Sequence, residues 1–294
     1  MAREEATLAS LSQASSQVAA SRPSRLRIEA SRGWRSLRPR ELWEYRELLW
    51  FLTTRDIRGR YRQMALGPLW IALKPLLNMV IFSLVFGKLA RLPSDGVPYP
   101  IFSYAALLPW TYFANAATSA TGSLVSRLNV ISKVYFPRLV LPLSAVLSGL
   151  VDLGVSFLIL VGMMLFYGFI PSTAVLVLPL YILLAAATAL CVGLWSATLA
   201  VRYRDLQYGI SYLIQAGMYL TPVVYSSRLI AEQWQPVYRL NPMYWTVEGF
   251  RWALLGSGHA PEPYMLVSVG LVLLLLATGT FVFRRTERTI VDWL

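Results

Sequence analysis

The sequence predicts an all-α integral membrane protein with six transmembrane helices, and three observations support this class. Of the 294 residues, 56% are hydrophobic and only 14% are charged, against about 25% charged residues in a soluble domain. Mean hydropathy is +0.52. The apolar residues form charge-free runs of the length needed to cross a hydrocarbon core of about 30 Å. No separate soluble domain is therefore expected.

Several classes of function are excluded or disfavoured by the residue types that are scarce. The single cysteine, Cys191, cannot form an intramolecular disulfide, and the single histidine, His259, cannot supply a histidine-based metal cluster. The phosphate-binding pattern GxxxxGK[ST] and the zinc pattern HExxH do not occur. Past residue 66 the eight acidic residues lie far apart in sequence. We therefore expect no metal site and no enzymatic activity, although distant acids could still meet in space in a membrane glycosyl- or acyltransferase.

Residues 1–38 are rich in Ser, Ala and Arg and poor in large apolar residues, so a disordered cytoplasmic tail is predicted. The net charge of +12 is concentrated near the start of the chain, where 13 of the 27 Lys and Arg fall within residues 1–66. That distribution fits a segment beside anionic membrane lipid better than a nucleic-acid-binding surface. No signal peptide is expected, because Glu4 and Glu5 precede any apolar run.

Residues 39–62 are predicted to form an amphipathic interface helix. Its apolar positions at helical spacing are Leu42, Tyr45, Leu49 and Leu52. The aromatic side chains of Trp43, Trp50 and Phe51 suit the headgroup region of a membrane. A helix packed on a protein partner explains the pattern equally well, and the two arrangements are compatible.

The rest of the chain, 63–294, is predicted to be one transmembrane domain. The six spans are expected at about 67–87, 99–123, 139–167, 172–201, 206–225 and 264–283. Gly168 and Pro171 divide an uncharged stretch of 49 residues into the end of the third span and the fourth. With six spans, 21 Lys and Arg lie on the face that holds the termini and five on the other. Both termini are therefore expected in the cytoplasm.

Two charged residues fall inside expected spans. Lys74 lies near the start of the first span, so its amine can extend back to the interface. Asp152 lies near mid-membrane, where a carboxylate must be protonated, paired or facing water. An interior-facing structural role for Asp152 is favoured over a transport site, because one acid forms no relay.

Two cytoplasmic loops and one outer loop carry further information. The segment Leu124–Arg138 is predicted to be a short amphipathic helix that ends at Pro137. Spacing alone favours an interfacial helix over a lever that fits a groove on a cytoplasmic partner. The turn with Arg202, Arg204 and Asp205 is expected to have a structural role, in which these charges anchor the chain at the interface or pair with each other.

The outer segment, Ser226–Pro263, contains two apolar stretches that are too short to cross the membrane. They lie around Leu229–Tyr238 and Met243–Leu255, and we expect re-entrant or interfacial helices there.

Four ordered blocks of sequence resemble a known family. They are the run RYRQMALGPLWIALKPLLNMVIFSLVFGKLARLPSDGVPYPIFSYAALLPW, the block NVISKVYFPRLVLPLS, the turn VRYRDLQY, and TPVVYS followed by LNPMYWTVEGFRWALLG. Together they are similar to the permease subunit of ABC-2 type polysaccharide exporters, which carry O-antigen-like or teichoic-acid-like glycans on lipid carriers. The resemblance covers about residues 40–285.

The resemblance implies a bacterial inner-membrane transporter of two permeases and two ABC ATPases, which moves a lipid-linked polysaccharide through a channel between the permeases. ATP and Mg would be bound by the ATPase, so no cofactor is expected in this chain. The residues that would couple to the ATPase are Leu124, Arg127, Leu128, Asn129, Ile131, Lys133, Tyr135, Phe136 and Arg138. The outer helices would cap the channel, with a rim formed by Trp234, Tyr238, Tyr244 and Trp245.

Aromatic rings can guide a sugar chain by stacking, so aromatic residues in the spans are the candidates for the channel wall. These are Trp110, Tyr112, Phe113, Tyr212, Tyr219 and Tyr225. Aromatic residues in spans commonly pack on lipid or on other helices instead. Export of another amphiphile, a membrane transferase and an ion-coupled carrier are the alternatives that the sequence leaves open.

Overall fold

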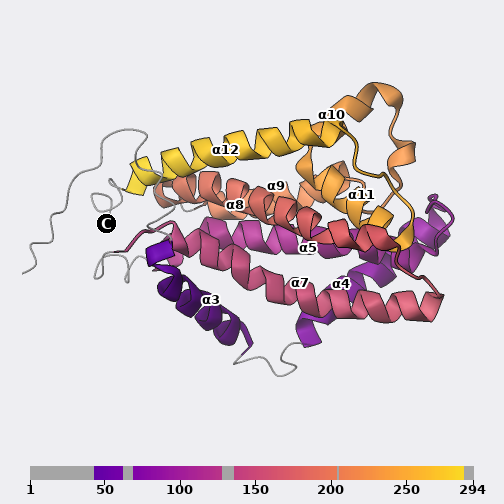
Figure 1. Ribbon diagram of the computed structural model, residues 1–294, viewed down its shortest axis with the longest axis horizontal. Helices are drawn as coiled ribbons and strands as arrows, with labels where there is room; N and C mark the ends of the chain where they lie inside the picture. The colour runs from indigo at the N-terminus through magenta and orange to yellow at the C-terminus, as the bar shows by residue number, and fades with distance from the viewer. Residues whose placement is uncertain (1–42, 62–68, 128–135, 204, 288–294) are drawn as a thin grey trace, which may run out of the picture. The chain divides into compact units, whose positions relative to one another are not determined.

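The computed structural model describes residues 43–61, 69–127, 136–203 and 205–287. The chain divides into two units, Met1–Ser36 and Leu37–Leu294, and the described residues all belong to the second. Within them every regular element is a helix (Figure 1), in agreement with the all-α class. The predicted disordered tail falls outside the described residues.

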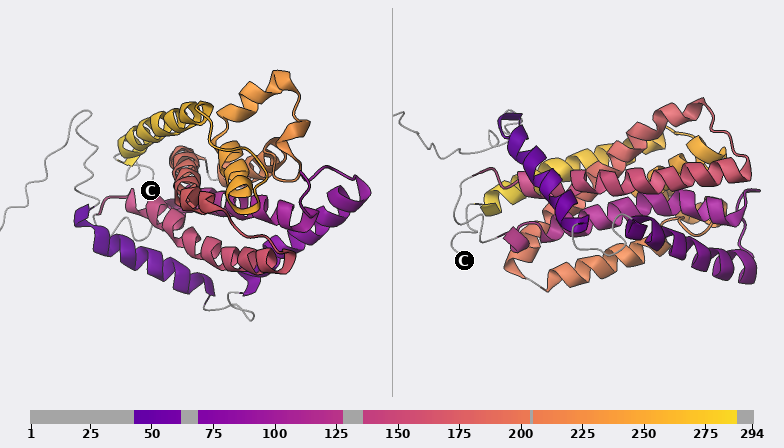
Figure 2. Two further views of the ribbon diagram at one scale, coloured as in Figure 1. Left: turned by 45° about the vertical axis from the view of Figure 1, so that its right-hand side comes forward. Right: turned by 90° about the horizontal axis from the view of Figure 1, so that it is seen from below.

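Helix α3 (Arg46–Tyr61) lies within the predicted interface helix and crosses the long helices at an angle (Figure 2). It packs on α7 (Val140–Tyr167) and buries Leu52. On other sides it exposes Trp50 and Phe51, at 72% and 60%. Apolar side chains thus point both toward the bundle and away from it. This arrangement suits a helix held between protein and a membrane surface.

The centre of the bundle is α5 (Tyr99–Gly122), which packs against α4 (Leu69–Phe82), α7, α8 (Leu178–Arg202), α9 (Leu206–Leu220) and α11 (Pro242–Leu255). Small residues allow the closest of these contacts. A Cβ atom on Gly193 of α8 would lie 2.4 Å from the Cβ of Ala120 on α5, so only glycine fits there. Helix α4 continues as one π-helical stretch, η2 (Ser83–Leu89).

The predicted break between the third and fourth spans is confirmed. Gly168 ends α7 in the left-handed conformation, with φ of 74°, which glycine adopts without steric cost. The chain re-enters through the 3-10 turn η4 (Thr173–Val177), where the hydroxyl of Ser172 accepts a hydrogen bond from the Ala174 amide at 3.2 Å. Helix α8 follows directly.

The outer segment folds into short helices, as expected. They are η5 (Ser227–Leu229), η6 (Glu232–Trp234), α10 (Gln235–Leu240) and α11, and they precede the last long helix, α12 (Tyr264–Glu287). The side chain of Asn241 begins α11 by accepting a hydrogen bond from the Met243 amide at 3.0 Å, and Gly256 ends it in the left-handed conformation.

Four of the described helical stretches are long and apolar enough to span a membrane, which leaves the predicted count of six unconfirmed. They are Leu69–Leu89, Val140–Tyr167, Thr173–Arg202 and Tyr264–Thr286. Helix α5 has 24 residues, but its polar side chains make it less apolar, and its neighbours cover most of it.

Helix α9 has 15 residues and therefore extends only about 22 Å at 1.5 Å per residue. It ends at Leu220, five residues before the expected end of the fifth span, because Pro222 lacks the amide that a continuing helix needs.

Candidate functional site

One face of α5 carries uncharged polar side chains that this single chain leaves uncovered. Asn115, Thr118 and Ser119 are exposed and Thr111 is half-buried. Their spacing of three or four residues places them on one stripe of the helix. Exposed polar groups are costly against hydrocarbon, so the stripe is better suited to face water or another protein surface than lipid tails. The aromatic reasoning above missed these residues, although their helical spacing is visible in the sequence.

Helix α9 packs beside α5 and bears a matching stripe. Tyr208, Tyr212 and Tyr219 are 75%, 74% and 51% exposed, and Gln215 is exposed on the same face. Two of these residues, Tyr212 and Tyr219, are among the predicted channel candidates. Together, the stripes of α5 and α9 form what we call the polar wall: Thr111, Asn115, Thr118, Ser119, Tyr208, Tyr212, Gln215 and Tyr219.

The other channel candidates point elsewhere. Trp110 and Phe113 are buried, with ring centroids 5.3 Å apart, and border an apolar cavity of about 460 Å³ between α5, α8, α9 and α12. Tyr112 is buried and its hydroxyl donates to the Val146 carbonyl at 3.3 Å. Tyr225 is half-buried and its hydroxyl donates to the Tyr219 carbonyl at 3.2 Å. These four side chains therefore contribute to packing within this chain.

The predicted outer rim divides into two pairs. Trp234 is 55% exposed, and with Tyr238 it lines an outer cavity of about 620 Å³. Tyr244 and Trp245 lie in the core, at 4% and 1% exposure, and the indole of Trp245 donates to the Arg239 carbonyl at 2.8 Å. Only the first pair has surface that a passing chain could touch in this conformation.

A buried ion pair fixes the outer helices, and sequence reasoning missed it. Glu248 and Arg251, three residues apart on α11, are 1% and 0% exposed and 3.1 Å apart. The guanidinium also donates to the carbonyls of Pro222 and Val223, at 2.6 and 2.8 Å, and lies 3.6 Å from the ring centre of Phe102. A Glu and an Arg at i and i+3 inside an apolar helix was the available signal.

The electrostatics of this pair follow from its burial. Loss of hydration lowers the pKa of the Arg251 guanidinium, and the carboxylate of Glu248 opposes that shift. Glu248 in turn accepts a hydrogen bond from the Ser227 hydroxyl at 2.9 Å. The non-helical segment after α9 therefore has its carbonyls satisfied by Arg251, which explains how it remains inside the fold.

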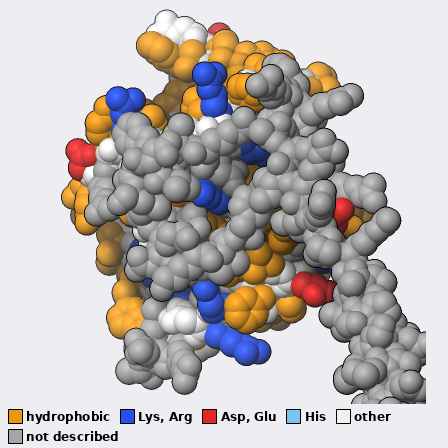
Figure 3. All heavy atoms as spheres, turned by 90° about the vertical axis from the view of Figure 1, so that its left-hand side faces the viewer, with side chains coloured by type: hydrophobic (Ala, Val, Ile, Leu, Met, Phe, Trp, Pro, Cys, Tyr) orange, Lys and Arg blue, Asp and Glu red, His pale blue; other side chains and the backbone are white. Residues whose placement is uncertain are grey.

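Several described helices begin or end at the opposite end of the bundle (Figure 1), and arginines lie at these termini. Figure 3 views this end and shows Lys and Arg side chains among hydrophobic ones. The arginines at these termini are Arg127, Arg138, Arg202, Arg284 and Arg285. This is the end that the charge count assigns to the cytoplasm. Of the predicted turn, Arg202 lies 5.4 Å from the Tyr203 ring centre, Asp205 precedes α9, and Arg204 falls outside the described residues.

The structure describes part of the predicted coupling helix. Five of its candidate residues lie outside the described residues: Leu128, Asn129, Ile131, Lys133 and Tyr135. On either side of this gap, Leu124 and Phe136 are buried in one apolar cluster with Leu52 of α3. Arg138 is half-buried, and Arg127 forms an ion pair with Asp56 of α3.

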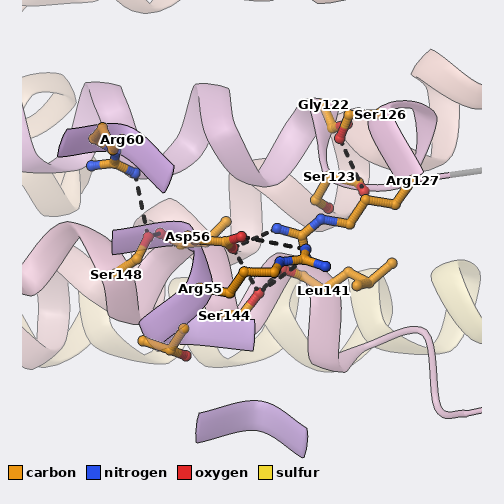
Figure 4. Close-up of polar contacts among 12 residues, drawn as sticks. Arg55, Asp56, Arg60, Gly122, Ser123, Ser126, Arg127, Leu141, Ser144 and Ser148 are labelled. Atoms are coloured by element: carbon orange, nitrogen blue, oxygen red, sulfur yellow. Dashed lines mark hydrogen bonds and ion pairs between the residues drawn. The ribbon is translucent and has the colours of Figure 1, made fainter. Parts of the chain in front are cut away.

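Polar contacts tie α3 to α7 and to the 3-10 turn η3 (Val125–Arg127) that follows α5 (Figure 4). Asp56 accepts from Arg127 and from the Ser144 hydroxyl, the latter at 3.5 Å. Arg60 forms an ion pair with Asp152 and donates to Ser148 at 3.4 Å. Of the three states considered for Asp152, the structure therefore shows the paired one. Tyr61 also donates its hydroxyl proton to Asp152.

Comparison with known proteins gives a consistent result. The sequence profile of the ABC-2 type transporter family matches residues 47–255. The O-antigen export system permease protein RfbA of Myxococcus xanthus is 32% identical over 84% of this chain and 96% of its own length. RfbA of Klebsiella pneumoniae is 28% identical over 82% of this chain and 92% of its own length. The polysialic acid transport protein KpsM of Escherichia coli is 21% identical over 80% of this chain and 92% of its own length.

Proposed function

The chain belongs to the ABC-2 type transporter family of membrane proteins, and we propose that it is the transmembrane subunit of an ATP-driven exporter of a lipid-linked polysaccharide. The relatives named for O-antigen export and polysialic acid transport support a glycan as the cargo. A bacterial inner-membrane location with both termini in the cytoplasm agrees with the arginines gathered at one end of the bundle.

The polar wall is the observation that best supports a path for a glycan. A hydroxyl-rich chain needs hydrogen-bonding partners and aromatic faces in place of water, without tight binding at any one point. Hydrogen-bonding groups are provided by Asn115, Thr118 and Gln215. Hydroxyl groups together with aromatic faces are provided by Tyr212 and Tyr219. In a homodimer whose two copies place these walls opposite each other, a polar channel would lie between the permeases. The exposed polar groups would then avoid the hydrocarbon core.

Energy for transport would come from a separate partner. Two copies of an ABC ATPase, which bind ATP and Mg themselves, would dock on the cytoplasmic segment that includes Arg127 and Phe136. The permease would convert their movement into opening of the path. The outer helices with Trp234 and Tyr238 would cover the exit.

Reconstitution tests this function with a substitution in the polar wall. The permease and its ATPase are placed in vesicles with lipid-linked glycan, and glycan that reaches the far side is measured by cleavage with an enclosed glycosidase. We expect Thr118→Leu combined with Asn115→Leu to lower export at least about tenfold, since two polar groups of the wall are lost.

The matched control is Thr278→Leu on α12, a helix that packs on α8, α10 and α11. Its hydroxyl bonds to its own helix, at 2.9 Å from the Leu274 carbonyl. Equal export by both variants would contradict a path along the polar wall. Export of a lipid without a glycan would favour another amphiphile as cargo, and glycan-bond formation without ATP would favour a membrane transferase.

A further inference from the structure

Two helices meet through residues spaced one turn apart on each. On α3, Asp56 and Arg60 are four residues apart, and on α7, Ser144, Ser148 and Asp152 follow at the same spacing. Residues at this spacing share a helix face. Asp56 contacts Ser144, and Arg60 contacts both Ser148 and Asp152. The two faces are therefore matched along their length.

Arg127 adds a third element to this contact. It is the last described residue before the segment 128–135, and its guanidinium donates to Asp56 and, at 3.5 Å, to Ser144 (Figure 4). The turn η3, the middle of α3 and the start of α7 thus meet at one carboxylate. We call the contacts of Asp56 with Arg127 and of Arg60 with Asp152 the double clamp.

The carboxylate of Asp56 has a second cation beside it, because the guanidinium of Arg55 lies 3.5 Å away. Three arginines, Arg55, Arg60 and Arg127, thus face two acids, and the side chains of the two clamp pairs are 14% to 29% exposed. Apolar side chains of similar volume would attach α3 at least as firmly, so the ion pairs are not required for attachment alone. Since Arg55 and Arg127 both lie beside Asp56, the carboxylate can change partners without losing its counter-charge. That property suits a joint that shifts and re-forms in each transport cycle.

We call the predicted coupling helix, Leu124–Arg138, the coupling segment. We propose that the double clamp makes α3 the element that passes movement of this segment on to α7. Asp56 and Arg60 are then positioning residues: they keep the segment that follows Arg127 in register with the bundle. This inference rests on the proposed function, because it assigns a mechanical role in export driven by the ATPase. The Asp56 pair connects to the coupling segment and the Arg60 pair connects to the membrane-embedded part of α7.

Substitutions that reverse the charges of Asp56 and Arg127 test the clamp in the permease without its ATPase. In a Cys191→Ser background, which removes the only cysteine of the chain, a spin label at Ser126→Cys reports motion beside Arg127. We expect Asp56→Lys and Arg127→Glu each to increase label mobility, and the double variant to restore it. Arg58→Glu is the control, since Arg58 is exposed on the same helix. Unchanged mobility in both single variants overturns the clamp.

The second measurement uses the permease with its ATPase in vesicles. The glycan exported per ATP hydrolysed should fall about tenfold in each single variant and recover in the double variant. The amount of folded complex serves as the reference. A ratio that stays at the wild-type value while label mobility rises overturns the mechanical role.

The two measurements separate the clamp from the proposed function. If the wild-type complex hydrolyses ATP but exports no glycan, the proposed function fails and the mechanical role fails with it. The label mobility still decides whether the Asp56–Arg127 ion pair joins α3 to η3. Rescue in both measurements supports the whole inference.

Discussion

The two ends of this bundle both contain ion pairs, but of opposite kinds. At the outer end Glu248 and Arg251 are at most 1% exposed and bound to several further partners. At the end that the charge count assigns to the cytoplasm, the side chains of Arg127 and Asp56 keep 15% and 17% of their surface. A fully buried pair cannot separate without leaving a charge unsolvated, whereas a partly hydrated one can. The outer helices are thus anchored, and the joint with α3 is adjustable.

The largest expected effect comes from removing the buried ion pair of the anchored end. Arg251→Met leaves the Glu248 carboxylate buried without a counter-charge and leaves the carbonyls of Pro222 and Val223 without a donor. We expect a loss of about 3–5 kcal/mol in the free energy of unfolding. Thermal unfolding of the purified protein in detergent measures it.

The control for this variant is Arg228→Met, whose side chain is 74% exposed and lies 3.4 Å from Asp95. It should change stability by less than about 1 kcal/mol. If Arg251→Met unfolds at the temperature of Arg228→Met, the distinction between anchored and adjustable ends is wrong.

The second effect sharpens the comparison, because part of the cytoplasmic half is also rigid. Gly193→Ala places a Cβ 2.4 Å from that of Ala120, two residues before the end of α5, so α5 and α8 must move apart. We expect a loss of about 1–3 kcal/mol. The double variant Gly193→Ala with Ala120→Gly should recover most of it, and Gly209→Ala, where no atom lies within 4 Å, should be nearly neutral. Failure of the double variant to recover would place the strain elsewhere.

The sequence predicted the fold well where the signal is local. Apolar runs gave the long helices, and Gly168 with Pro171 gave the break between α7 and η4. The length of α9 was overestimated because the hydropathy stays high up to Tyr225. The helix ends before Pro222, and Arg251 donates hydrogen bonds to the carbonyls that follow. The donor of these hydrogen bonds is 29 residues away from Pro222, so the residues around Pro222 do not reveal it.

The candidate site was less predictable, for a related reason. Aromatic residues were selected by type, but Trp110 and Phe113 turn into the core while Tyr212 faces outward. Which face of a helix is covered depends on the neighbouring helices. The stripe with Asn115 was accessible from spacing, but the contact of Asp56 with Arg127, 71 residues apart, was not.

A smaller effect tests whether the cytoplasmic joint is adjustable. Asp56→Asn removes the charge that faces Arg127 but keeps the shape of the side chain. We expect a loss of about 1 kcal/mol in the free energy of unfolding at low ionic strength, and less at high salt, since partly hydrated pairs are screened. Parallel unfolding curves at the two salt concentrations measure the difference. A large loss that salt does not change would show that this pair is anchored like the outer one.

The smallest effect concerns the phenol that joins the same contact. Burial, followed by the hydrogen bond to Asp152, raises the pKa of Tyr61 above its ordinary value of 10.0. The folded state therefore holds this proton more tightly than the unfolded state. The stabilisation is fully present below pH 10 and is lost as the pH rises above it. Tyr61→Phe has no proton to lose, so its stability should fall less steeply than that of the wild type above pH 10, with a small constant loss at neutral pH from the missing hydrogen bond. Unfolding temperatures of the two proteins from neutral to alkaline pH give the slopes, and parallel slopes would mean that Tyr61 ionises as freely in the folded chain as in the unfolded one.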